Sequence, residues 1–127
     1  MITHFIFYVR DQQASCEFYS SVLTIMPRLN VPGMTEFALS DTCIFGLMPE
    51  AGIKKLLGCA LPDPAEANGI PRAELYLVVS NAHEYFSRAL SFGAKALNAV
   101  AKRDWGHEVG YCLDRDGHVI AFAQVSN

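Results

Sequence analysis

Two titratable residues stand at equivalent places in two similar stretches of the chain. His4 begins the apolar run HFIFYVR, and Glu74 begins the apolar run ELYLVVS about seventy residues later. An imidazole is the commonest metal ligand and carries protons near neutral pH, and a partly buried carboxylate with a raised pKa can act as a general base. The pair therefore predicts either metal binding or acid–base chemistry.

Each of the two residues also has a purely structural interpretation. His4 can be a hydrogen-bonded histidine near the start of the chain, and Glu74 can pair with Arg10 or Arg72. If the side chains of His4 and Glu74 instead come within about 6 Å, the range of strong charge coupling, they form an acid–base pair that needs no metal.

The two stretches belong to a longer internal repeat. Each apolar run ends at a helix-capping residue, Asp11 or Asn81, and a helix-like run follows, QQASCEFYSSVL or AHEYFSRALSFG. A second pair of similar stretches, DTCIFGLM from Asp41 and DGHVIAFA from Asp116, lies about seventy-five residues apart. We therefore expect an α+β fold made of two βαβββ modules, with function where the two copies face each other.

Alternation along the first strand of each module separates two faces. Tyr8 shares a mixed face with His4, and Tyr76 shares a mixed face with Glu74, whereas the intervening residues are apolar. The apolar face suits a covering helix, and the mixed face suits a ligand site. Tyrosines packed at the edge of the core are the alternative for both Tyr8 and Tyr76.

Periodicity and turn residues predict the remaining elements. Gly93 stands where a helix ends with a left-handed residue. The segment 50–72, rich in Pro and Gly, is expected to be a linker with a short helical turn, or a flap over a cavity. The expected strands after each helix are a hairpin at 35–39 and 43–48, a strand at 95–100, and a hairpin at 105–113 and 119–124.

Composition limits the class of protein. With 127 residues, half of them hydrophobic, the chain is expected to form one compact domain with modules at 1–49 and 73–127. The net charge is −3 and no Lys/Arg run occurs, which argues against a nucleic-acid partner. No apolar stretch approaches the roughly 18 residues of a membrane span and no signal peptide is recognisable, so a cytoplasmic location is expected.

The four cysteines have no metal-binding spacing. Cys16, Cys43, Cys59 and Cys112 form no CxxC pair and no zinc-finger pattern. Free thiols are therefore expected, with Cys59 as the exposed one.

At this point the chain resembles the glyoxalase/bleomycin-resistance/dioxygenase superfamily, which has the vicinal-oxygen-chelate fold. The resemblance rests on HFIFYVRD with a following FY, on ELYLVVSN with a following helix and glycine, and on RDWG followed by DRDGHVIAF. It implies two βαβββ modules whose cupped mixed sheets enclose a small-molecule cavity, commonly in a homodimer. It also implies a divalent metal held by the first and last strands of each module.

The metal positions of the family fall on four residues of this chain. His4 and Glu74 can bind a metal, but Gly46 and Ala121 offer no side-chain ligand atom. A metal held by one histidine and one glutamate would bind weakly, so the sequence predicts no tightly bound cofactor and at most weak binding of a divalent metal. His107 and His118 are the possible substitute ligands from the last hairpin.

Aromatic and cationic residues of the second module complete the candidate site. Trp105 and Tyr111 are expected to line the cavity or its rim together with His107, and core packing is the alternative for both aromatic residues. Arg103 and Asp104 are expected to be structural, although an arginine can hold an anionic substrate.

Three functions follow from these residues. The leading prediction is a protein that binds a small amphipathic or aromatic molecule without a complete metal site, similar to the drug-sequestering branch of the superfamily. The first alternative is a divergent metal-dependent lyase, isomerase or dioxygenase whose metal site is completed by other groups or a partner subunit. The second is a regulatory or interaction module without catalysis.

Overall fold

The computed structural model describes residues 1–127, and the chain divides into two compact units, Met1–Asn68 and Gly69–Asn127. Each unit is described by itself. The first contains β1 (Thr3–Val9), α1 (Gln12–Leu23), β2 (Leu29–Val31), β3 (Met34–Ala38), β4 (Cys43–Pro49), α2 (Glu50–Leu57) and the short 3-10 helices η1 (Gly58–Ala60) and η2 (Pro64–Ala67). The second contains β5 (Glu74–Val78), α3 (Ala82–Ser91), β6 (Lys95–Lys102), β7 (His107–Leu113) and β8 (Val119–Val125).

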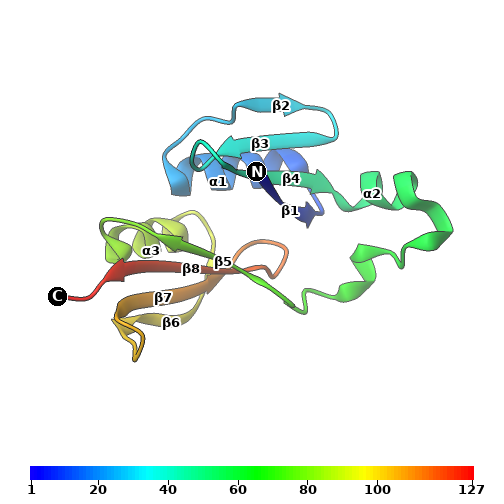
Figure 1. Ribbon diagram of the computed structural model, residues 1–127. Coiled ribbons are helices and arrows are strands. Elements are labelled where there is room, and N and C mark those ends of the chain that lie inside the picture. Colours follow the sequence, from blue (N-terminus) through cyan, green and yellow to red (C-terminus); the bar gives the residue numbers. More distant parts are fainter. The chain divides into compact units, whose positions relative to one another are not determined.

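The first unit is a four-stranded mixed sheet in the order β1-β4-β3-β2 (Figure 1). β1 pairs in parallel with β4, and the other two pairs are antiparallel. α1 covers one face, where the Tyr19 ring lies 4.8 Å from the fully buried Phe45 ring. Phe7 meets the same ring edge-on at 5.2 Å, so an aromatic cluster joins the helix to the sheet.

The second unit repeats this arrangement in the order β5-β8-β7-β6. α3 covers one face of the sheet, with the Tyr85 ring 5.8 Å from Phe122. Gly110 on β7 brings the layers close together, because a Cβ there would lie 2.9 Å from Phe86 of α3 and 2.7 Å from Val100 of β6. The α+β fold with two βαβββ modules and two mixed sheets is therefore confirmed.

The pairing register confirms the internal repeat. Ile6 of β1 lies beside Gly46 of β4, and Tyr76 of β5 lies beside Ala121 of β8. The two pairs are related by the offsets seen in the sequence. Gly46 and Ala121 are therefore equivalent positions in the two sheets.

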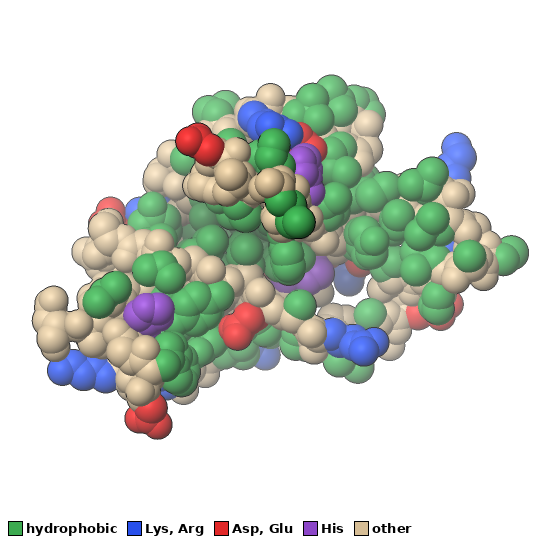
Figure 2. All heavy atoms as spheres, viewed as in Figure 1, with side chains coloured by type: hydrophobic (Ala, Val, Ile, Leu, Met, Phe, Trp, Pro, Cys, Tyr) green, Lys and Arg blue, Asp and Glu red, His purple; other side chains and the backbone are tan.

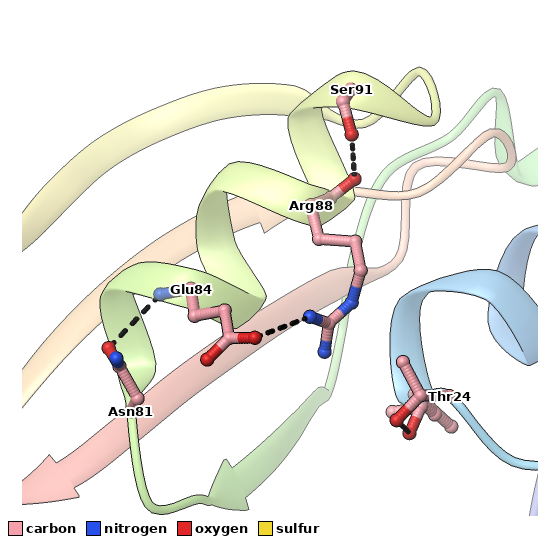
Figure 3. A network of polar contacts seen from close by, with 6 residues as sticks. Thr24, Asn81, Glu84, Arg88 and Ser91 are labelled. Atoms are coloured by element: carbon pink, nitrogen blue, oxygen red, sulfur yellow. Dashed lines mark hydrogen bonds and ion pairs between the residues drawn. The ribbon is translucent and has the colours of Figure 1, made fainter.

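Both helices begin at the expected capping residues. The Asp11 side chain accepts a hydrogen bond from the Ala14 N–H at 3.0 Å, and the Asn81 side chain accepts one from the Glu84 N–H at 3.2 Å (Figure 3). Along α3, Arg88 forms an ion pair with Glu84 at 3.3 Å (Figure 3). After α3, Gly93 has φ 104, the left-handed conformation expected for it.

The structure differs from the sequence-based expectation in two places. The segment expected to hold only a short helical turn contains α2, whose Ile53 is buried, and Figure 2 shows hydrophobic side chains gathered over this helix, where Leu56 and Leu57 are exposed. The strand predicted to start at Trp105 begins at His107, because Gly106 has φ 86 and turns the chain. Trp105 therefore lies in the turn between β6 and β7 rather than in the strand.

Two glycines tie the start of the second unit to the β7–β8 turn. Gly117 has φ 87, and a Cβ on it would lie 2.6 Å from the Gly69 carbonyl oxygen. This contact fixes the chain a few residues before β5.

None of the helices combines the length and the apolar character needed to span a bilayer.

Candidate functional site

Each sheet has one face that its own unit's α1 or α3 does not cover. Alternation along β1 places Phe7 and Val9 under α1, whereas His4, Ile6 and Tyr8 point to the other face. α1 meets the apolar face of the first sheet through Tyr19 and Phe45, the β4 partner of Phe5. α3 meets the corresponding face of the second sheet through Tyr85 and Phe122, the β8 partner of Leu77. The opposite, helix-free faces carry the candidate site residues.

Tyr76 is the centre of the helix-free face of the second sheet. Its hydroxyl accepts a hydrogen bond from the Trp105 indole N–H at 2.9 Å and lies 2.6 Å from Nδ1 of His107. The Tyr76 and His107 rings also stack, with centroids 5.8 Å apart. The turn that removes Trp105 from the strand is what lets its indole reach back to Tyr76.

Small buried residues lie beneath the aromatic ones. Val109, Ala121 and Ala123 form a buried cluster, and Tyr76 and Tyr111 pack against it as half-buried side chains. In the register of β5, β8 and β7, Ala121 lies between Tyr76 on one side and Tyr111 on the other. Within the sheet, only the methyl group of Ala121 stands between the two tyrosine side chains.

Two charged residues shift the pKa of Tyr111 in opposite directions. Burial raises the pKa of the Tyr111 phenol, and the Glu74 carboxylate raises that pKa further, whereas the Arg103 guanidinium opposes the shift and Tyr76 adds slightly to it. Glu74 is exposed and forms no salt bridge within its unit. It therefore supplies an unpaired negative charge on the face that carries Tyr76 and Tyr111.

Arg103 is held by the protein itself. Its Nη2 donates to the Asn98 side chain at 2.6 Å and to the Val109 and Ala99 carbonyl oxygens at 2.8 Å and 3.3 Å. Its Nε is buried and has no hydrogen-bond partner, and its guanidinium carbon lies 5.4 Å from the Tyr111 ring centroid. The structural role expected for Arg103 agrees with these contacts.

The helix-free face of the first sheet carries an ion-pair network that the sequence had not indicated. Nδ1 of His4 lies 3.4 Å from Oε2 of Glu36, and the Arg28 guanidinium donates to Oε1 of Glu36 at 2.9 Å and 3.0 Å. The Glu36 side chain is 13% exposed. Glu36 on β3 pairs with Gly46 on β4, whereas the side chains nearest to a Cβ on Gly46 would be Ile6 and Met34.

The structure therefore brings together part of the predicted set. Tyr76, Trp105 and His107 form one hydrogen-bonded group, with Tyr111 on the same face. His4 belongs to the first unit, where its carboxylate neighbour is Glu36. Tyr8 lies half-buried on β1, and Glu74 lies exposed on β5.

Glu36 was missed although the sequence contains a signal for it. It is the one charged residue in the strand MTEFA, and an isolated charge in an apolar hairpin strand needs a partner. The signal becomes specific only with the register that places Glu36 beside Gly46.

The metal-binding positions of the fold do not suit a metal here. Gly46 and Ala121 have no ligand atoms, and Ala121 is fully buried under the tyrosines. Glu36, which comes nearest to replacing Gly46 as a ligand, has one carboxylate oxygen committed to the Arg28 guanidinium. A fixed positive charge on that carboxylate disfavours a divalent cation beside it.

A second group of possible metal ligands lies in the β7–β8 turn. Ligand atoms of Asp114, Asp116 and His118 all lie within 4.8 Å of one another. However, Oδ1 of Asp114 accepts hydrogen bonds from the backbone N–H groups of Asp116 and His118, both at 2.9 Å. These bonds stabilise the turn, and they account for the buried Asp114 without a cation.

Solved structures share this fold over nearly the whole chain. A glyoxalase-related enzyme from Fulvimarina pelagi superposes with a TM-score of 0.81 at 18% identity, over 98% of this chain and 87% of its own. A glyoxalase/bleomycin resistance protein/dioxygenase family enzyme from Burkholderia phytofirmans PsJN gives 0.80 at 16% identity, over 96% of each chain. At these identities the similarity shows the fold alone.

The sequence itself shows the family. The model of the Glyoxalase/Bleomycin resistance protein/Dioxygenase superfamily matches residues 1–122, and the chain belongs to that superfamily. None of the curated proteins compared with the chain matches it.

Proposed function

We propose that this protein binds a small aromatic or amphipathic molecule on the helix-free face of its second sheet, and that binding does not require a resident metal. The observation that supports this most directly is the Tyr76 hydroxyl, which is held between the Trp105 indole and the His107 imidazole. Aromatic side chains with one oriented polar group are typical of small-molecule sites.

The half-buried tyrosines provide the contact surface for an aromatic ligand. Ala121 and Ala123 are the smallest side chains compatible with a packed strand, and they lie between or beside the tyrosine rings. A flat ligand would rest on the exposed parts of the half-buried Tyr76 and Tyr111 rings, which themselves cover Ala121. Burial of such a ligand removes apolar area from water on both partners, at roughly 25 cal/mol per Å².

A metal-dependent reaction has less support from the residues present. Gly46 and Ala121 provide no ligands, and the carboxylate of Glu36 is paired with Arg28. Metal content after incubation with manganese, iron, nickel and zinc and exhaustive dialysis tests this part of the proposal. We expect far less than one metal per chain; about one retained metal per chain would favour a lyase or dioxygenase instead.

Trp105 provides a direct signal for ligand binding. It is the only tryptophan in the chain, its side chain is 56% exposed, and it touches Tyr76. Titration with the neutral aromatic N-phenyl-1-naphthylamine and with aminoacridine should change the Trp105 emission and saturate at one ligand per chain. A linear, unsaturable change with every compound would contradict a defined site.

Two variants separate the site from the rest of the surface. Tyr111→Ala should weaken ligand binding about tenfold, because one ring contact is lost. Tyr85→Ala removes a tyrosine from α3, on the covered face of the same sheet, and should leave binding unchanged. Isothermal titration calorimetry measures both, with circular dichroism as the check on folding.

The homodimer and the cytoplasmic location stay predictions, and light scattering tests the first.

A further inference from the structure

The hydrogen bonds of Tyr76 determine what its hydroxyl can offer a ligand. A phenol hydroxyl has one hydrogen and two lone pairs, and an indole N–H can only donate. Trp105 therefore uses one lone pair of the Tyr76 oxygen. The 2.6 Å separation from Nδ1 of His107 is shorter than the roughly 2.9 Å typical of an N–H donor, and fits the hydroxyl as the donor to the ring nitrogen.

The remaining capacity of Tyr76 is one lone pair. With its hydrogen directed to His107 and one lone pair taken by Trp105, the hydroxyl can still accept one hydrogen bond. A ligand group that meets this oxygen must therefore be a donor. A carboxylate or another acceptor would face a lone pair and be repelled.

The charged groups near Tyr76 also favour a ligand that carries a hydrogen-bond donor and a positive charge. Glu74 stands two residues before Tyr76 on the same face of β5 and forms no salt bridge within its unit. The one arginine at this face, Arg103, already donates to three oxygens, and its Nε is buried. Arg103 keeps its positive charge, but its donors are committed to protein oxygens, so Glu74 is the charged group that is left to pair with a ligand.

The aromatic rings of the site also favour a cationic ligand over an anionic one. The π faces of Tyr76, Tyr111 and Trp105 carry partial negative charge and attract cations. The guanidinium of Arg103 beside the Tyr111 ring is an example within the same sheet. No ring contact joins Tyr76 to Tyr111, so Ala121 separates two aromatic surfaces.

We propose that the Tyr76 site selects planar aromatic cations that carry N–H groups, such as protonated aromatic amines or amidines, over anions of the same shape. This inference rests on the proposed small-molecule binding and adds the ligand class. In the complex, an N–H of the ligand donates to the Tyr76 oxygen, the ring lies against the exposed Trp105 indole, and Glu74 balances the positive charge.

A pair of ligands matched in shape tests the selection. Binding of aminoacridine and of acridine carboxylate, substituted at the same ring position, is measured by calorimetry at neutral pH. We expect at least about tenfold tighter binding of the amine, which corresponds to one charge-assisted hydrogen bond. Equal binding, or tighter binding of the carboxylate, overturns the inference and leaves the proposed aromatic site intact. No binding of either compound, with an unchanged Trp105 emission, overturns both.

Variants assign the selection to individual groups. Glu74→Gln should reduce the preference for the amine by about threefold or more, with little risk to folding because Glu74 is exposed. Tyr76→Phe should weaken the amine about tenfold and change the carboxylate by less than about twofold. Tyr85→Phe, which removes a hydroxyl from the other face, is the matched control and should change neither. An unchanged preference in both Glu74→Gln and Tyr76→Phe contradicts the inference.

Discussion

Glu36 connects three segments of the first unit through one carboxylate. It lies on β3, its Oε1 accepts from Arg28 just before β2, and its Oε2 lies beside His4 on β1. Because the Glu36 side chain is only 13% exposed whereas Arg28 is 48% exposed, the pair is screened less than a fully solvated one. The network fixes the outer strands of the sheet relative to each other.

Neutralising Glu36 should therefore destabilise the fold. Glu36→Gln keeps the shape but removes the negative charge, and we expect the free energy of unfolding to fall by about 1 kcal/mol. Urea denaturation followed by circular dichroism measures the change. Glu84→Gln is the matched control, because the Glu84 side chain is 63% exposed in a pair along one helix. It should cost no more than about 0.5 kcal/mol; an equal loss in both variants contradicts a special role for Glu36.

The Cys112 thiol should make stability depend on alkaline pH. Burial, and then the Asp114 carboxylate, raise the pKa of Cys112 from 9.0 to about 12. Because the folded-state pKa is raised, the stabilisation is complete below about 9 and is lost as the pH rises towards 12. Between these values the free energy of unfolding should fall by up to about 1.4 kcal/mol per pH unit.

Alkaline denaturation of two cysteine variants isolates this effect. Cys112→Ala should show a shallower loss of stability with pH, whereas Cys59→Ala, which removes an exposed thiol, should keep the slope of the parent chain. The same difference should appear with a thiol reagent at neutral pH, where Cys59 reacts quickly and Cys112 reacts only on unfolding. Rapid labelling of Cys112 in the folded protein would falsify its assignment as buried.

At the residue scale, sequence reasoning identified part of the candidate site. The sequence predicted Tyr8, Tyr76, Trp105, Tyr111 and His107 as ligand-binding residues. The last four lie on one face of the second unit, whereas Tyr8 lies in the first unit, and the role of all five in binding stays a prediction. The hydrogen bonds among them depend on the Gly106 turn, whose conformation follows from a positive φ that no periodicity specifies. Glu36 depends on the register of three strands at once, which is a non-local property.

At the element scale, the spacing between α3 and the second sheet depends on Gly110. Its missing side chain leaves room for Phe86 and Val100, which a Cβ would approach to 2.9 Å and 2.7 Å. Gly110→Ala should therefore push α3 or β6 away and lower the free energy of unfolding by about 1 to 3 kcal/mol. Thermal and urea denaturation measure the loss.

Gly52 in α2 provides the control for this substitution. A Cβ at Gly52 would meet its nearest neighbour, Pro49, at 3.8 Å, which is an ordinary contact. Gly52→Ala should be neutral or stabilising by up to about 1 kcal/mol, because alanine favours the helix. If Gly110→Ala is equally harmless, the close approach of α3 to β7 is wrong.

The elements themselves were largely predictable because they follow from local patterns. Asp11 and Asn81 marked the helix starts correctly, and alternation separated the faces of β1 and β5. The helix α2 was reduced to a turn in the prediction, because Pro and Gly around it resemble a linker. Its buried Ile53 shows that packing within the first unit decides the conformation.

At the scale of the whole molecule, β4 and β8 are the equivalent inner strands of the two sheets. β4 is paired on both sides, by β1 and β3, and β8 is paired on both sides, by β5 and β7. In hydrogen exchange, amides of Ile44–Leu47 and Ile120–Ala123 should therefore be the slowest, at least about tenfold slower than those of the edge strands β2 and β6. Slow exchange confined to one unit would show that the two copies of the repeat differ in stability.

Because Gly117 contacts Gly69, equivalent positions in the two modules differ in the side chains that they can accept. Thr42 occupies the place in the first module that Gly117 occupies in the second, and it carries a β-branched side chain there. At position 117 any side chain would collide with the backbone of Gly69. A mutational library should consequently accept many residues at 42 and almost none but glycine at 117, so two halves that are alike in fold tolerate different substitutions.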